Sequence, residues 1–194
     1  MPTVATGRPG RPAAATREQA LQLARARFAA GQRVDVQAIA RELGLARATM
    51  HRWFRTRELL LGAVLADIGQ ERLIELRRRT GGHGAQALLD SFDAFNRDLA
   101  RGTGLRALLV AEPDLALRVL TSSDGLVQSR MVATVQQLIQ EEIQHGFEPT
   151  LDPDLIAYAI VRLAEAFLYR DVSMGVAAET GRLRQLEQAL LRED

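Results

Sequence analysis

Cysteine is absent from this chain of 194 residues, and so is lysine, because all 25 basic residues are arginine. Without cysteine there is no disulfide, no thiol nucleophile and no thiolate metal ligand. The three histidines stand apart in the sequence, so we expect no metal site and no cofactor. A run of about 18 apolar residues, the minimum for a membrane helix, is missing, as is the apolar stretch of a signal peptide. These absences predict a cytoplasmic protein that does not enter a membrane.

Charge is divided unevenly along the chain. Residues 1–60 contain eleven Arg and four acids, a net charge of +7, while residues 61–194 contain fourteen Arg and twenty acids, a net charge of −6; together they give the overall +1. A basic segment attached to an acidic body is typical of a polyanion-binding domain. We therefore divide the chain into a flexible basic arm (1–15), a basic head (16–60) that is expected to bind a polyanion, and a body (61–194).

The head contains a window with the layout of a helix-turn-helix unit. Asp35 can cap a helix over 36–43, and Gly44 gives the backbone freedom that a sharp turn needs. A second helix, about 47–54, has an inward face at the spacing i, i+3, i+4, formed by Met50, Trp53 and Phe54. Its outward residues suit entry into a DNA major groove: Arg47, Ala48, Thr49, His51 and Arg52.

The run GLARATMHRWFRTRELLL, preceded by VQAIAREL, resembles the signature of the TetR family of bacterial repressors. The resemblance covers about residues 16–65 and implies an all-α protein, with a three-helix head on a larger helical body for effector binding and dimerisation. Two positions depart from the family pattern. Ala46 stands where a capping Ser or Thr is usual, which costs about 1 kcal/mol of local helix stability. His51 stands where Tyr is usual, so its charge depends on pH.

Contacts to DNA are assigned by chemistry and by this resemblance. Arg47, and secondarily Arg52, can offer a bidentate fork to guanine. The resemblance implies phosphate contacts from Thr49, Trp53 and Arg57, the last helped by its place at a helix N-terminus.

Further contacts are expected outside the second helix. Gln37 could bond a phosphate. In the arm, Arg8 and Arg11 lie among Gly and Pro. They either enter a narrow minor groove or belong to a disordered tail.

The body has no alternating strand pattern, and helical periodicity continues to its end. Thr16 opens the first helix with a capping box and Thr56 caps a long helix over about 57–79. We expect the remaining helices over 84–100, 105–111, 113–121, 124–144 with Ser123 or Asp124 as cap, 152–172 opened by Asp152–Pro153, and 180–192.

In the TetR resemblance, helices 124–145 and 152–172 pair with their copies in a homodimer. Apolar residues expected at this interface are Val127, Met131, Val135, Leu138, Leu155 and Ala159. The helix over 152–172 is apolar around most of its circumference, so one face would serve the dimer and the other a ligand chamber. Arg162 and Glu165 on it form either an ion pair or part of that chamber.

The chamber is expected beneath helices 84–100, 105–121 and 155–170. Asn96 shares an apolar face there and needs a partner for its amide. A mostly apolar chamber suits a small amphiphile such as a lactone, a fatty acid or an aromatic compound. Candidate lining residues are Leu88, Phe92, Phe95, Asn96, Leu109, Leu117, Leu120, Arg162, Glu165 and Tyr169.

Two segments of the body, LRVLTSSDGLVQSR and YAIVRLAEAFLYRD, resemble the TetR-type subgroup that controls degradation of quorum-signal lactones. The resemblance implies a repressor of palindromic operator DNA that is released by a lactone or acyl-chain effector.

Catalytic motifs are not found: there is no nucleophile elbow, paired-carboxylate motif, phosphate loop or His-x-x-x-His. Glu141 and His145 form one i, i+4 pair that is typical of a solvated surface, so we expect no enzyme. The alternative is a helical ligand carrier or adaptor whose basic head binds an acidic protein surface. Salt dependence and competition with duplex DNA would separate the two.

Overall fold

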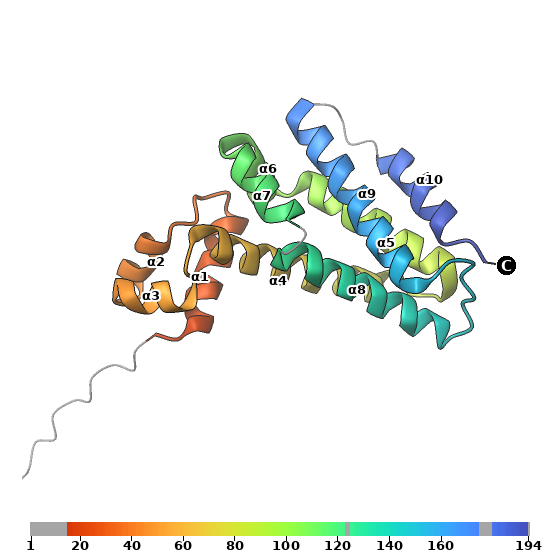
Figure 1. The fold of residues 1–194 in the computed structure, drawn as a ribbon, viewed down its shortest axis with the longest axis horizontal. Coiled ribbons are helices and arrows are strands. Elements are labelled where there is room, and N and C mark those ends of the chain that lie inside the picture. The colour runs from red at the N-terminus through yellow and green to blue at the C-terminus, as the bar shows by residue number, and fades with distance from the viewer. Residues whose placement is uncertain (1–14, 123–124, 175–179, 194) are drawn as a thin grey trace, which may run out of the picture.

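The computed structural model describes residues 15–122, 125–174 and 180–193, the last seven residues of the middle range by their backbone alone. Within these ranges the protein consists of ten α-helices and no β-strand, which confirms the all-α fold. Figure 1 shows a small helical head at one end of the molecule and a larger helical body at the other. No helix among the described residues is long and apolar enough to cross a membrane.

The head is formed by α1 (Arg17–Ala29), α2 (Val36–Glu42) and α3 (Arg47–Trp53). Thr16 and Gln19 make the expected capping box at the start of α1. The carboxylate of Asp35 accepts from the backbone N–H of Ala38 at 2.7 Å, which satisfies a donor that the first turn of α2 leaves open. Gly44, between α2 and α3, has a φ of +62°, a conformation that favours glycine.

The body begins with α4, which starts in the head and runs along the whole length of the body (Figure 1). Its first turn is capped by the Thr56 hydroxyl, which accepts from the backbone N–H of Leu59 at 3.1 Å. The helices of the body are α4 (Arg57–Thr80), α5 (Gly84–Arg101), α6 (Thr103–Ala111), α7 (Pro113–Thr121), α8 (Leu126–Ile143), α9 (Pro153–Met174) and α10 (Thr180–Leu190).

A single hydrophobic core extends from the head into the body. Ala20, Leu21 and Phe28 of α1 belong to the same buried cluster as Ile139 of α8 and Ile156 of α9. α4 packs against α1, α5 and α8, so it is the element through which the core is continuous. α4 therefore connects the packing of the head with that of the body.

The start of α8 and its apolar stripe both differ from the sequence-based expectation. Its N-cap is Gly125, while Ser123 and Asp124 lie outside the described residues. The expectation that its apolar stripe lies at a dimer interface is wrong for Val127, Met131, Val135 and Leu138, because all four are buried within the protomer. They pack inward because α8 lies between α4 and α9, which already cover the stripe.

The outward apolar residues of the expected interface lie on α9 instead. Leu155 is 54% exposed and Tyr158 is 51% exposed, and Ala159 is partly exposed. Leu126 at the start of α8 is 40% exposed. These side chains, rather than the buried stripe of α8, are available to a second copy.

Candidate DNA-binding surface and effector cavity

The outer face of α3 carries the residues expected to read DNA. Met50 is fully buried and fixes the helix against the rest of the head. Thr49 and Trp53 are partly buried, and Trp53 packs against the core. The expected contact residues on the outer face are exposed: Arg47, Ala48, His51 and Arg52. Gln37 of α2 is exposed as well.

The arginines of the head fall into two groups. Arg25 pairs with Glu71 and Arg27 pairs with Glu42. In contrast, Arg47, Arg52 and Arg55 are exposed and form no ion pair or hydrogen bond among the described residues. Three of the unpaired arginines of the described head thus lie on α3 and directly after it, and Arg41 of α2 is a further exposed one.

Arg55 was missed by the sequence analysis. Its signal was an arginine in the short segment between Phe54 and the capping Thr56, where no intrahelical partner is available. Arg8 and Arg11 lie outside the described residues.

Arg57 at the start of α4 does not project freely toward a phosphate. Its guanidinium donates to the backbone oxygen of Val34 at 2.5 Å and to both carboxylate oxygens of Glu112 at 2.5 Å and 2.7 Å. These hydrogen bonds hold the pKa of Glu112 below its usual value. Arg33 adds a longer contact to the same carboxylate at 3.8 Å. A phosphate contact from Arg57 would require it to release Glu112.

Glu112 lies between α6 and α7, so its bond to Arg57 ties the head to the body. A second contact between head and body lies close by, where Gly104 of α6 touches the backbone of Phe28. A side chain at position 104 would overlap the Phe28 carbonyl oxygen. Because glycine permits this approach, α6 rests directly on α1.

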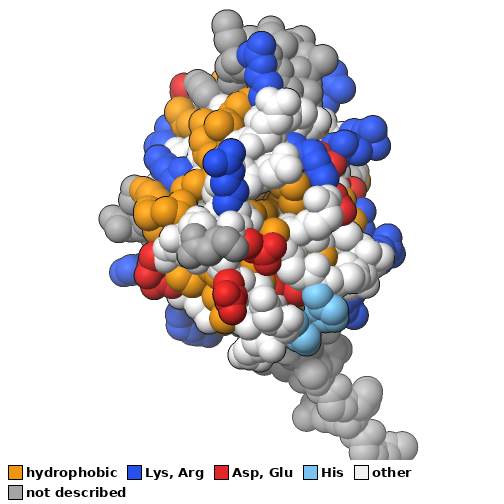
Figure 2. Space-filling view, turned by 90° about the vertical axis from the view of Figure 1, so that its right-hand side faces the viewer, with side chains coloured by type: hydrophobic (Ala, Val, Ile, Leu, Met, Phe, Trp, Pro, Cys, Tyr) orange, Lys and Arg blue, Asp and Glu red, His pale blue; other side chains and the backbone are white. Residues whose placement is uncertain are grey.

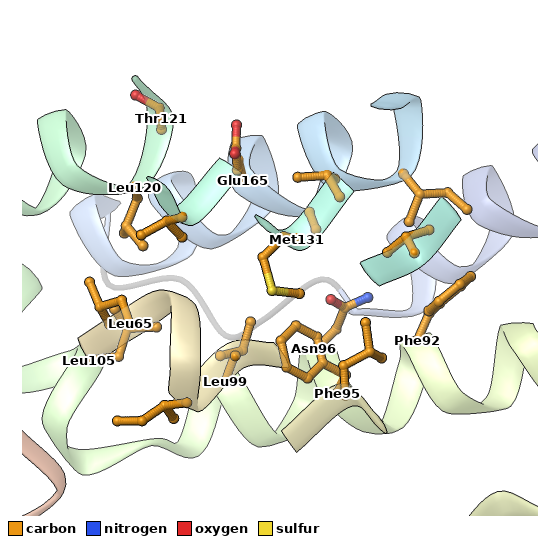
Figure 3. A pocket seen from close by; sticks show the side chains of 18 of the residues that line it. Leu65, Phe92, Phe95, Asn96, Leu99, Leu105, Leu120, Thr121, Met131 and Glu165 are labelled. Carbon is orange, nitrogen blue, oxygen red and sulfur yellow. The ribbon is translucent and has the colours of Figure 1, made fainter. Parts of the chain in front are cut away.

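The body contains a partly open cavity of about 130 Å³. Figure 3 shows its two sides, with Phe92, Phe95 and Asn96 on one and Leu120 and Glu165 on the other. Phe28 from the head also lines it. The other lining residues among those described are Leu65, Ile68, Gly69, Leu73, Leu99, Leu105, Leu109, Leu117, Thr121, Val127, Met131, Val135, Ile160, Val161, Ala164 and Glu187.

Seven of the ten expected lining residues surround this cavity: Phe92, Phe95, Asn96, Leu109, Leu117, Leu120 and Glu165. Leu88 does not, because it is fully buried on the core side of α5. Arg162 does not line it either; its guanidinium donates to Glu165 at 2.7 Å and to the Thr121 backbone oxygen at 3.5 Å. The ion pair between Arg162 and Glu165 is thus present, while Glu165 also lines the cavity. The side chain of Tyr169 lies outside those that are described.

Polar groups enter the cavity at two places. Asn96 donates from Nδ2 to Oε1 of Glu187 at 2.9 Å, so the expected partner of the amide is a carboxyl group of α10. Burial raises the pKa of Glu187 to about 7, opposed by the Asn96 hydrogen bond. At the other place, burial raises the pKa of Glu165 despite its bond to Arg162. Sequence analysis missed Glu187, which looked like any helical acid.

Two histidines that stand far apart in the sequence meet on the surface of the body. The rings of His83 and His145 stack with their centroids 4.3 Å apart. Figure 2 shows histidine side chains gathered at one edge of this end of the molecule. Together with Glu142 they place possible metal-ligand atoms within 4.8 Å of one another. The expectation that the histidines are isolated is wrong, because the fold brings the start of α5 beside the end of α8.

Glu142 itself already has partners. One carboxylate oxygen accepts from Arg77, and the other accepts from the backbone N–H of Gly84 at 2.7 Å. Burial acts to raise its pKa, but these hydrogen bonds outweigh it and the pKa is lowered. The group therefore fastens the turn between α4 and α5 to α8. The predicted pair of Glu141 and His145 is made through the Glu141 backbone oxygen, at 2.7 Å from Nδ1.

A helix-turn-helix head on a helical body with an apolar cavity is the architecture of one-component DNA-binding regulators. The Tetracyclin repressor-like, C-terminal domain family matches residues 83–192. The chain therefore belongs to the TetR family of transcriptional regulators. Members of this family are non-enzymatic proteins that bind operator DNA and small-molecule effectors and act as dimers.

Solved structures of this family share the fold. The transcriptional repressor QsdR of R. erythropolis is 28% identical, with a TM-score of 0.83 over 90% of this chain and 93% of QsdR. The repressor AlkX of Dietzia sp., implicated in biodegradation of n-alkanes, is 23% identical, with a TM-score of 0.58 over 95% and 100%. FadR of Bacillus subtilis, solved in complex with stearoyl-CoA, is 16% identical, with a TM-score of 0.54 over 91% and 97%. Among curated proteins no match was found.

Proposed function

We propose that this protein is a homodimeric repressor that binds palindromic duplex DNA through α3 and leaves it when a small apolar or amphiphilic effector fills the cavity. The observation that carries the proposal is the position of Phe28. This residue belongs to α1 of the head, yet it lines the cavity of the body. An occupant of the cavity therefore touches the DNA-binding head directly.

DNA binding is supported by the charge on α3. Arg47 and Arg52 are exposed and unpaired among the described residues, so their guanidinium groups are available without breaking an internal bond. Arg47 is the stronger candidate for a bidentate contact to guanine, because residues near the start of a recognition helix reach the base edges. Thr49, His51, Trp53 and Arg55 are proposed to contact phosphates.

The switch is proposed to act at the seam between head and body. α6 and α7 line the cavity through Leu105, Leu109 and Leu117, and their junction carries Glu112, which holds Arg57. An effector that displaces α6 or α7 moves Glu112 and the N-terminus of α4 with it. The two heads of a dimer must fit successive major grooves about 34–36 Å apart, so a small rotation of α4 is enough to lose the match. The effector acts only through its different affinity for the two states.

The dimer is proposed to form through the outer faces of α8 and α9, where Leu126, Leu155 and Tyr158 are exposed. The match to QsdR and the two body segments that resemble lactone-responsive regulators support placing this protein in that subgroup. A helical carrier whose head binds an acidic protein surface is the competing hypothesis.

Selection of duplexes from a random pool, followed by fluorescence anisotropy, tests the DNA-binding proposal. We expect enrichment of a palindromic site and a steep fall of affinity with salt, because phosphate contacts release counterions. Competing duplex of unrelated sequence should displace the site only at much higher concentration. Recovery of no enriched sequence, with acidic polypeptides competing as well as the duplex, would support the carrier hypothesis instead.

A further inference from the structure

Glu187 is an ionisable group that is buried at the effector cavity. It is fully buried, lines the cavity and comes from α10. Its Oε1 accepts from Asn96 at 2.9 Å, while its Oε2 has no hydrogen-bond partner. A buried polar atom without a partner costs about 1–3 kcal/mol, so an occupant of the cavity that forms a hydrogen bond with this oxygen would recover that cost.

Burial is the main factor that favours the protonated form of Glu187, and a nearby acid adds to it. Asp93 of α5 is close enough to oppose ionisation, and Arg184 of α10, which favours ionisation, has its guanidinium engaged by Asp90 at 2.5 Å and Asp93 at 3.5 Å. On the α9 side of the cavity the described ionisable groups are Arg162 and Glu165, which pair with each other. Because Oε1 accepts from Asn96, a proton on Glu187 is carried by Oε2, which then becomes a hydrogen-bond donor.

The rest of the lining limits the ligand further. The described residues around the cavity include two acids, Glu165 and Glu187, and no Arg or His. An anionic head group would therefore lose its hydration without gaining a cation. Size adds a second limit, because a partly open cavity of about 130 Å³ admits only a small molecule.

We propose that the effector is a small uncharged molecule whose oxygen accepts a hydrogen bond from the protonated carboxyl group of Glu187, beside Asn96, with its apolar part among Phe92, Phe95 and Met131. The proposal rests on the effector cavity described above and narrows its ligand. Esters, lactones and ketones fit this chemistry, whereas fatty carboxylates do not. The ligand is thus selected by the protonation state of a group that the C-terminal helix supplies.

The test uses a matched set of probes on the full-length dimer. γ-Octalactone and its ring-opened form, 4-hydroxyoctanoate, have the same carbon chain and differ in charge, and octylammonium supplies the opposite charge. Calorimetric titration at pH 6 should give binding by the lactone at least tenfold tighter than by either ion. Equal or tighter binding by 4-hydroxyoctanoate or octylammonium, or no heat with the lactone, would overturn the proposal.

The pH dependence identifies the group. Since burial places the pKa of Glu187 at about 7, about a tenth of the protein holds the proton at pH 8, and lactone affinity should fall roughly tenfold from pH 6 to pH 8. Glu187→Gln keeps a donor at every pH and should remove this dependence while retaining binding. Glu165→Gln, at the other polar place in the same cavity, is the matched control and should keep it.

If Glu165→Gln abolishes the pH dependence of lactone affinity and Glu187→Gln does not, the oxygen of the ligand is bound at Glu165 instead of Glu187, and the proposal fails. Binding of the selected duplex, measured without ligand in the same samples, separates this failure from failure of the proposed function. Loss of duplex binding by the wild-type protein contradicts the regulator, whereas intact duplex binding with the wrong probe preference contradicts only the assignment of Glu187.

Discussion

The recognition helix of the head and the body of this protein differ in how their arginines are paired. On α3 and just after it, arginines are exposed and lack internal partners in the described structure, whereas in the body most arginines are held by carboxylates, as Arg72 is by Asp98 and Arg130 by Asp67. The head thus presents its charge to an external polyanion, while the body uses charge to fasten helices around an apolar cavity. Paired surface charges contribute little stability, so their value here lies in fixing geometry.

The largest effect expected in the body concerns Glu187. Its pKa is about 7 in the folded protein, against the ordinary glutamate value of 4.5, so between these two pH values the folded state binds a proton that the unfolded state has lost. The stabilising contribution is complete below pH 4.5 and is lost as pH rises through 7. Relative to wild type, Glu187→Gln should therefore gain about 3 kcal/mol of unfolding free energy between pH 4.5 and pH 8.

Urea unfolding at fixed protein concentration measures this difference. Glu148→Gln, the same substitution at an exposed site, serves as the control and should show no comparable change. A constant difference between wild type and Glu187→Gln over this pH range would mean that the group is not buried as a neutral acid.

The largest effect expected in the head is that of Arg47→Ala on the selected duplex. Loss of a bidentate contact should cost roughly 1–3 kcal/mol and relax discrimination at one base pair. Arg41→Ala removes an exposed arginine of α2 and should weaken all duplexes alike. Anisotropy titrations against single-base variants of the site distinguish the two, and an unchanged base preference in Arg47→Ala would remove this residue from the recognition role.

A smaller effect is expected at the seam between the two regions. Glu112→Gln removes the ionic partner of Arg57 and should reduce the coupling between effector and DNA by about 1 kcal/mol, or roughly fivefold. The readout is the ratio of duplex affinities with and without saturating γ-octalactone. Glu58→Gln, which loses the exposed pair with Arg118 at 3.1 Å, is the control.

Arg57→Ala refines this result. If Arg57 turns to a phosphate in the DNA complex, the variant should also lower the salt slope of duplex binding by about 1, and Glu112→Gln should not. If both variants keep the wild-type ratio of duplex affinities with and without γ-octalactone, the ion pair of Arg57 and Glu112 plays no part in the switch.

The smallest effect concerns the missing cap of α3. Ala46 makes no side-chain hydrogen bond at the N-cap, so Ala46→Ser should stabilise the first turn of α3 by up to about 1 kcal/mol. Slower hydrogen exchange of the α3 amides would report it, with the amides of α1 as internal reference. Equal exchange in both proteins would show that the serine does not cap the helix.

The sequence predicted the helices well because their ends carry local signals. The capping box at Thr16, the caps at Asp35 and Thr56, and Pro113 at the start of α7 all act within one turn of the chain. The face of α3 could be predicted for the same reason, since burial of Met50 fixes which neighbours point outward.

What the sequence could not show depends on contacts between distant segments. An apolar stripe on α8 is the same whether its own protomer or a second copy covers it, so Val127 and Met131 were assigned to the wrong surface. Glu187 and Asn96 lie on helices far apart in the chain, and only packing of α10 on α5 buries the carboxyl group. His83 and His145 were misjudged for the same reason.

The central claim is that the cavity of the body and the α3 surface of the head are coupled. Calorimetric titration of γ-octalactone into the protein alone, and into its complex with the selected duplex, tests it most directly. Coupling is reciprocal, so the account predicts that bound duplex weakens lactone binding by the same factor by which the lactone weakens duplex binding. Equal lactone affinity in the free and DNA-bound protein would contradict it.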